Sequence, residues 1–271
     1  MLRKFSNTRS VFFGRAGLIF FMAFLCSSYS GKQTVLIHSH NDYQKNIPFY
    51  RAYSQQVHTI EADIYAAPAS DGLLVAHDPH ELDSALSLDE MYLEPLIFLF
   101  GQNEGRPWRG SEQVLTLMID LKTPLHPTID RLIAKLKRHP EVFDPSVNPY
   151  AVRIVISGSR PDPEAFGEYP RFISFDGFID VDYTPQQLER VAFISEPFFR
   201  YSKWEGGADT LSAEDRQVIE SLVAKSHKTG KPIRFWGSPD TVNAWETFRE
   251  LGIDIINTDR PEACTLYFQE H

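Results

Sequence analysis

Short apolar runs alternate with polar or amphipathic stretches along most of this chain. The apolar runs predict strands at 34–38, 58–64, 114–122, 152–157, 172–175, 192–195, 233–236 and 253–257, with a hairpin strand at 73–76. Periodicity and capping residues predict helices at 47–56, 87–100, 127–138, 184–190, 212–229 and 238–252. Eight strands that alternate with helices are typical of a (β/α)₈ TIM barrel of class α/β.

One closed parallel sheet follows from this pattern. We expect the barrel strands to contain apolar residues from both halves of the chain: Leu36, Ile60, Leu117, Ile154 and Ile233. The connections after 172–175 and 192–195 are irregular, so a distorted barrel is expected in that region.

Polar side chains follow or interrupt the first predicted strands. His38 and His40 come after the run Thr34 to Ile37, Glu61 and Asp63 lie in 58–64, and His77 follows 73–76. Because the carboxyl ends of parallel strands meet at one edge, these side chains are expected to converge there. Glu61 and Asp63 are two residues apart and therefore point to the same face of a strand. Two carboxylates on one face repel each other unless a cation lies between them, which predicts a site for a hard divalent metal ion.

These clusters resemble the glycerophosphodiester phosphodiesterase and phosphatidylinositol-specific phospholipase C superfamily. Ser39-His40-Asn41 with Tyr43 is similar to the Ser-His-Asn-Thr-Tyr stretch of phospholipase C catalytic domains. Asp71-Gly72, an apolar run and His77-Asp78 resemble a phosphodiesterase pattern, and Asp120-Leu121-Lys122-Thr123 resembles the Asp-Leu-Lys-Thr of spider-venom-type phospholipase D. The chain is most similar to the branch of the altered inheritance of mitochondria protein 6 type, with the specific motifs in its first half.

The resemblance implies a metal-dependent phosphoric diester hydrolase that acts on a small-molecule or lipid-headgroup phosphodiester. His40 and His77 would be its acid–base pair, one accepting a proton from the attacking hydroxyl and the other protonating the leaving oxygen. His38 is an alternative to His40, because it follows an apolar run as the histidine of the phosphodiesterase His-Arg-Gly motif does.

One divalent cation, Mg²⁺ or Ca²⁺, is the expected cofactor. Its expected oxygen ligands lie in the polar clusters: Glu61, Asp63, Asp120 and Asn41. The alternative is that Glu61 pairs with a basic residue such as Lys122, because a buried carboxylate needs a partner. The residues expected to contact the substrate lie at or near strand ends: Lys122, Trp236 and Asn257. Lys122 would bind a phosphate oxygen, whereas Trp236 is either a substrate platform or rim packing.

Two other functions are open at this point. His38-Ser39-His40 is also the His-x-His of amidohydrolase-type metallohydrolases, but that class needs further histidines at the fifth and sixth strands, where this chain has none. A non-catalytic binding module with the same barrel is the other alternative, and the metal-type carboxylates argue against it.

The first 30 residues have the features of a secretory signal peptide. Four basic residues precede an apolar run from Ala16 to Leu25, and Ser28-Tyr29-Ser30 offers small residues for cleavage. The expected organisation is a signal peptide at 1–30 and a phosphodiesterase barrel at 31–271, exported to the periplasm or the extracellular space. An uncleaved anchor is disfavoured because the run is short for a bilayer, and a lipoprotein is disfavoured because Leu25 precedes Cys26.

The charge balance is acidic. The formal net charge is −9, and loss of the four positive charges in 1–30 would give −9 − 4 = −13. Such a surface repels nucleic acid and anionic membranes, so we expect no nucleic-acid partner. No stable membrane span is expected after cleavage, and Cys264 alone would remain, which predicts no intramolecular disulfide.

Overall fold

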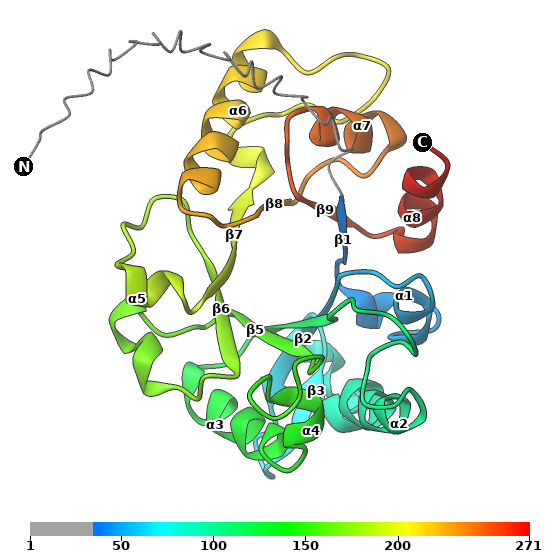
Figure 1. Ribbon diagram of the computed structural model, residues 1–271, viewed down its shortest axis with the longest axis vertical. Coiled ribbons are helices and arrows are strands. Elements are labelled where there is room, and N and C mark those ends of the chain that lie inside the picture. The colour runs from blue at the N-terminus through cyan, green and yellow to red at the C-terminus, as the bar shows by residue number, and fades with distance from the viewer. Residues whose placement is uncertain (1–34) are drawn as a thin grey trace, which may run out of the picture. The chain divides into compact units, whose positions relative to one another are not determined.

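The strands of the chain form a closed barrel (Figure 1). The computed structural model describes residues 35–271, and its strands are β1 (Leu36–Ser39), β2 (Thr59–Ala66), β3 (Leu73–Val75), β4 (Thr116–Leu121), β5 (Arg153–Gly158), β6 (Ile173–Gly177), β7 (Val191–Pro197), β8 (Ile233–Trp236) and β9 (Ile255–Thr258). The strand order is β1-β9-β8-β7-β6-β5-β4-β2-β3, and pairing of β1 with β2 closes the barrel. Of these nine strands, β3 is the antiparallel one, paired with β2. The predicted TIM barrel is confirmed, and the five apolar residues expected in its strands all lie there.

Helices surround the barrel on the outside (Figure 1). They are α1 (Tyr50–Ser54), α2 (Glu94–Gln102), α3 (Leu125–Leu136), α4 (Pro140–Phe143), α5 (Pro185–Leu188), α6 (Ala213–Lys228), α7 (Val242–Glu250) and α8 (Pro261–Glu270). Short 3₁₀ turns are η1 (Asp42–Gln44), η2 (Pro79–Ser84), η4 (Pro163–Glu168) and η5 (Phe198–Arg200), and the π-helical turn η3 (Asp89–Leu93) leads into α2. Apolar helix residues at helical spacing, such as Ile219 and Val223 of α6, pack into the core.

Hydrogen bonds from backbone N–H groups to nearby side chains explain where two of the predicted helices begin. Ser87 and Glu90 form the predicted capping box, in which the Glu90 N–H donates to Ser87 Oγ and the Ser87 N–H donates to Glu90 Oε2. The helix predicted from residue 47 begins only at Tyr50. Phe49 has a positive φ of 62°, and its N–H donates to the buried carboxylate of Asp42, so the chain cannot be helical there. Helix α8 was not predicted.

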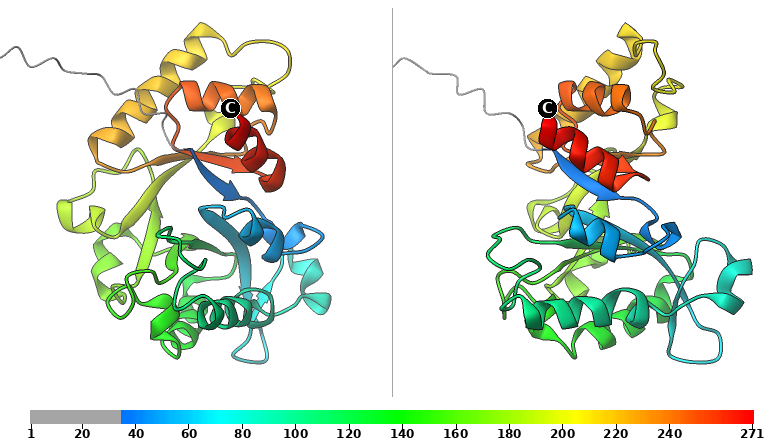
Figure 2. Two further views of the ribbon diagram at one scale, coloured as in Figure 1. Left: turned by 45° about the vertical axis from the view of Figure 1, so that its right-hand side comes forward. Right: turned by 90° about the vertical axis from the view of Figure 1, so that its right-hand side faces the viewer.

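The barrel is least regular on the side of β6 to β9. The β6–β7 ladder shifts register between Phe175 and Asp176, where the sequence predicted distortion. Strand β8 pairs with β9 through one residue pair, Arg234 and Ile255. On the other side, the β2–β3 connection and the segment after β3 extend beyond the carboxyl ends of the strands (Figure 2). Within residues 35–271, no helix is both long enough and apolar enough to cross a membrane.

Candidate functional site

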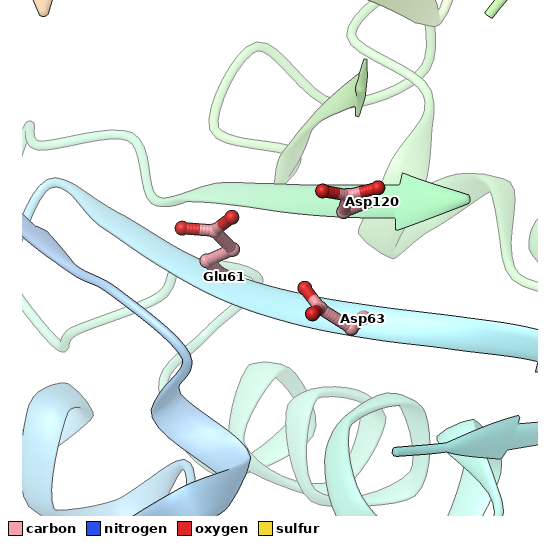
Figure 3. A group of neighbouring side chains, drawn as sticks. All are labelled: Glu61, Asp63 and Asp120. Carbon is pink, nitrogen blue, oxygen red and sulfur yellow. The ribbon is translucent and has the colours of Figure 1, made fainter. Parts of the chain in front are cut away.

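Three carboxylates lie together between β2 and β4 (Figure 3). Glu61 and Asp63 project from the same face of β2, and Asp120 is the ladder neighbour of Asp63 on β4. One oxygen from each of the three lies within 4.8 Å of the others. Gly158 of β5 makes room for this arrangement, because it has a φ of 68° and a Cβ there would collide with Asp120 Oδ1.

Two basic side chains offset this negative charge. Lys122 Nζ lies 2.9 Å from Asp63 Oδ2 and 3.0 Å from Asp120 Oδ2. Burial acts to lower the pKa of Lys122, but the two carboxylates outweigh it and raise the pKa, so the ammonium stays charged. Arg234 of β8 places Nη1 3.3 Å from Glu61 Oε2. Glu61 therefore pairs with a basic residue, as the alternative from sequence had it, but the partner is Arg234 and not Lys122.

The carboxylate cluster has the donor set of a divalent cation site. Asp63 Oδ1 is buried and has no hydrogen-bond partner in the described part of the chain. Burial raises the pKa of Asp63, and the neighbouring Glu61 carboxylate raises it further. An unsatisfied buried acceptor is costly, and carboxylate oxygens are the ligands that Mg²⁺ and Ca²⁺ prefer. Glu61, Asp63 and Asp120 therefore fit such an ion. Asn41, in the left-handed conformation after β1, lines the adjoining cavity.

His77 is held by Tyr43 and Asp63. Its Nδ1 lies 3.0 Å from Tyr43 Oη and 3.3 Å from Asp63 Oδ2, while Tyr43 Oη donates to Asp63 Oδ2 at 2.8 Å. Burial and the Asp63 carboxylate raise the pKa of Tyr43 far above 10, so the phenol keeps its single proton. Because that proton points to Asp63, the Tyr43 oxygen can only accept from His77 Nδ1–H. Nε2 of His77 remains for proton exchange.

His40 is held by Asp259, the residue that follows β9. Its Nδ1 lies 3.1 Å from Asp259 Oδ1, which also accepts from Lys45 Nζ at 2.8 Å. Burial acts to lower the pKa of His40, but the hydrogen bond to Asp259 and the carboxylates of Glu61 and Asp259 outweigh burial and raise it. The hydrogen bond with His40 lowers the pKa of Asp259 to about 2.

His38 is fully buried beneath the cavity. Its Nε2 lies 2.6 Å from both Glu61 Oε2 and Arg234 Nη1. A guanidinium only donates, so Nε2 either accepts from Arg234 or donates to Glu61. Burial and the adjacent guanidinium lower the pKa of His38 to about 4. An imidazole packed against a guanidinium is poorly placed to bind a cation, which argues against a His38–His40 metal site of the amidohydrolase type.

A cavity of about 580 Å³ opens above the cluster at the carboxyl ends of the strands, where TIM-barrel enzymes have their active sites. The residues named from sequence that line it are His40, Asn41, Glu61, His77, Asp120, Lys122 and Trp236. His38, Asp63 and Asn257 are not among the lining residues. Asp63 lies within the carboxylate cluster, and Asn257 turns its Oδ1 to Arg234 Nη1 at 3.2 Å. The structure therefore does not bring Asn257 to the place where a substrate would bind.

Three charged residues of the cavity wall were missed from sequence: Arg160, Asp176 and Arg234. Arg160 forms an ion pair with Asp176, which also accepts from Ser157 Oγ at 3.1 Å. A signal for Arg234 was present in the alternation of β8. Ile233 and Phe235 are apolar and belong to the core around the barrel, so the residue between them must point into the barrel.

Comparisons with known proteins agree with this architecture. Residues 29–143 match the family model of the AIM6-like phosphodiesterase domain. Altered inheritance of mitochondria protein 6 from Kluyveromyces lactis is 34% identical over 298 residues, covering 82% of this chain and 70% of the relative. The protein of the same name from Eremothecium gossypii is 25% identical over 268 residues, covering 85% of this chain and 69% of the relative.

A solved structure shows a similar barrel. A glycerophosphodiester phosphodiesterase from Parabacteroides distasonis superposes with a TM-score of 0.53 at 16% identity, covering 89% of this chain and 99% of the other. At this identity the likeness concerns the fold.

The predicted localisation is corrected by these comparisons. The relatives are named for altered inheritance of mitochondria, and that name contradicts the predicted export to the periplasm or the extracellular space. Residues 1–30, on which the signal-peptide prediction depended, lie outside the residues that the structure describes.

Proposed function

Because the chain belongs to the family of altered inheritance of mitochondria protein 6, we propose that it is a metal-dependent phosphoric diester hydrolase. Its substrates would be small phosphodiesters of the glycerophosphodiester or phospholipid-headgroup type. The observation that carries the proposal is the meeting of the Glu61, Asp63 and Asp120 carboxylates with His40 and His77 at one end of the barrel. The match to the AIM6-like phosphodiesterase domain, over residues 29–143, includes all five residues.

The carboxylates would hold the cation, and Lys122 would bind the substrate. Glu61, Asp63 and Asp120 would bind one Mg²⁺ or Ca²⁺, which when bound supplies positive charge to a phosphate oxygen. Lys122 lines the cavity with a charged ammonium beside Asp120. It would orient the phosphate and stabilise the negative charge that develops on it.

His40 and His77 would move the protons. Nδ1 of His40 is hydrogen-bonded to Asp259, and Nδ1 of His77 is hydrogen-bonded to Tyr43. Nε2 of each imidazole is therefore the nitrogen that would exchange a proton with the substrate. Nε2 of His40 would take the proton of the attacking hydroxyl while the hydroxyl oxygen forms its bond to phosphorus. Nε2 of His77 would give a proton to the oxygen whose bond to phosphorus breaks. Attack by a hydroxyl of the substrate itself would yield a cyclic phosphate.

A panel of phosphodiesters, each assayed with Mg²⁺ and with Ca²⁺, tests the proposal. We expect Asp63→Asn to remove metal-dependent activity and to weaken metal binding measured by calorimetry. Asp176→Asn is the matched control, because it changes an equally buried carboxylate that already has Arg160 and Ser157 as partners. If Asp63→Asn binds metal as tightly as the parent, the assignment of the cluster is wrong.

The metal content of purified His40→Ala separates acid–base catalysis from the amidohydrolase alternative. We expect this variant to be inactive and to retain its metal, because the proposal makes His40 a base and not a ligand. An inactive variant that has lost its metal would favour the alternative.

A further inference from the structure

Three exposed aromatic side chains border the cavity on the side of β6 to β8, and we call them the aromatic rim: Phe178, Phe199 and Trp236. Their exposed fractions are 48%, 60% and 37%. Phe178 and Trp236 line the cavity itself. Phe199 packs edge-to-face on Trp236 with ring centroids 5.3 Å apart, so the rim continues the cavity wall outward.

The rings of the rim are held in place by the residues around them. The Arg160 guanidinium lies 3.9 Å from the centroid of the Phe178 ring and is itself fixed by the buried carboxylate of Asp176. Gly237 has a φ of 61°, and a Cβ there would lie 3.2 Å from Phe199 Cδ1, so glycine permits the close approach of that ring. Rings that are already ordered lose little entropy when they bind a ligand.

We propose that the aromatic rim binds the acyl chain of a lipid phosphodiester whose phosphate lies at the carboxylate cluster. This inference rests on the proposed function and narrows its substrate class. His40 and His77 line the same cavity as Phe178 and Trp236, so one molecule can reach both the proton-transferring groups and the rim. The glycerol of a soluble glycerophosphodiester has no apolar group to cover these rings, whereas burial of an acyl chain there is favourable in proportion to the area removed from water.

The charge of the protein narrows the class of lipid that the rim would bind. The chain has a formal net charge of −9, which repels anionic lipids. The arginines next to the rim are each paired with a carboxylate, Arg160 with Asp176 and the exposed Arg200 with Glu196 at 3.7 Å. Two paired cations are far from a polybasic lipid-binding cluster. A lipid with a zwitterionic headgroup therefore fits best.

Two substrates that share one headgroup test the inference on the full chain. Glycerophosphocholine has no acyl chain and lysophosphatidylcholine has one, and ³¹P NMR follows the loss of either diester whichever P–O bond breaks. We expect Phe199→Ser to lower the ratio of kcat/KM for the lipid to kcat/KM for the soluble diester by about tenfold, the factor that corresponds to about 1.4 kcal/mol of lost apolar contact. Phe98→Ser is the control. Phe98 is 63% exposed on α2, away from the cavity lining, and its replacement should leave the ratio unchanged.

An unchanged ratio in Phe199→Ser, or an equal fall in Phe98→Ser, would overturn the inference while leaving the hydrolase proposal in place. If the parent cleaves neither of these two diesters, binding still tests the rim, and the proposed function fails only if the whole panel of phosphodiesters stays uncleaved with either metal. Calorimetry with dodecylphosphocholine, below its micellar concentration, should then show about tenfold weaker binding by Phe199→Ser than by the parent or Phe98→Ser. Equal affinities of all three proteins would overturn the role of the rim.

Discussion

Two buried carboxylates on different sides of the barrel, Asp63 of β2 and Asp176 of β6, differ in how many of their oxygens have a hydrogen-bond partner. Asp176 accepts from Arg160 through one oxygen and from Ser157 through the other. Asp63 accepts from Tyr43 and Lys122 through Oδ2, and its Oδ1 has no partner within the described residues. Both oxygens of the Asp176 carboxylate are thus satisfied, and the Arg160 that it holds lies against Phe178 of the aromatic rim. Asp63, on the β2–β4 side, keeps one oxygen that needs a further partner. The contrast teaches that, of these two buried carboxylates, the one with an unsatisfied oxygen is the candidate for binding an ion, and the fully paired one is structural.

The largest expected effect concerns His77, which adjoins Asp63. His77→Ala should lower kcat/KM for an alkyl phosphodiester by about 10²- to 10⁴-fold, the range of general acid–base contributions. The loss on a nitrophenyl diester should be much smaller, because an aryl oxide leaves without a proton. Ser157→Ala, which removes a partner of Asp176 instead, should cost far less on both substrates. Steady-state kinetics of the two variants decide this, and equal losses would remove the contrast between the two sides.

A second effect concerns Glu61, which connects the two sides by pairing with Arg234 across the barrel. Glu61→Ala would leave a guanidinium that is 3% exposed without its carboxylate, and loss of one partner of a buried pair costs about 3–5 kcal/mol of unfolding free energy. Asp63→Ala should destabilise less, because Lys122 keeps Asp120 and is partly exposed. Urea unfolding measures the unfolding free energy of both variants. Equal values would show that the buried Arg234 guanidinium does not need the Glu61 carboxylate as its partner.

The smallest effect is a shift in pH dependence. A general base must be neutral, and the pKa of His40 is raised by Asp259 and Glu61 against the effect of burial, so kcat/KM should fall as the pH drops through this raised pKa. Asp259→Asn removes the hydrogen-bonding carboxylate, lowers the pKa of His40 and should move the acidic limb of the profile to lower pH. A limb that stays in place or moves to higher pH in the pH–rate profile would contradict the pairing.

The barrel and its carboxylates were readable from sequence because their signals are local. The strand predicted at 233–236 coincides with β8, and the spacing of Glu61 and Asp63 places both on one face of β2. The partners of these groups are not local. Arg234 contacts His38 from 196 residues away, and no short pattern encodes such a contact. The late start of α1 depends on the bond from the Phe49 N–H to Asp42, which exists only once the chain has folded.

Because β8 and β9 are joined by a single residue pair, Arg234 also has a structural role in closing the barrel. Where the backbone ladder is sparsest, this one side chain contacts Ser195 on β7, His38 on β1, Glu61 on β2 and Asn257 on β9. Amide hydrogens along this seam should exchange with solvent sooner than those of the long β4–β5 ladder, because opening here breaks fewer backbone bonds. The contacts of Arg234 beneath the cavity therefore hold the barrel closed where β8 meets β9. A fluctuation that separates these two strands would also separate the charged groups on which the site depends.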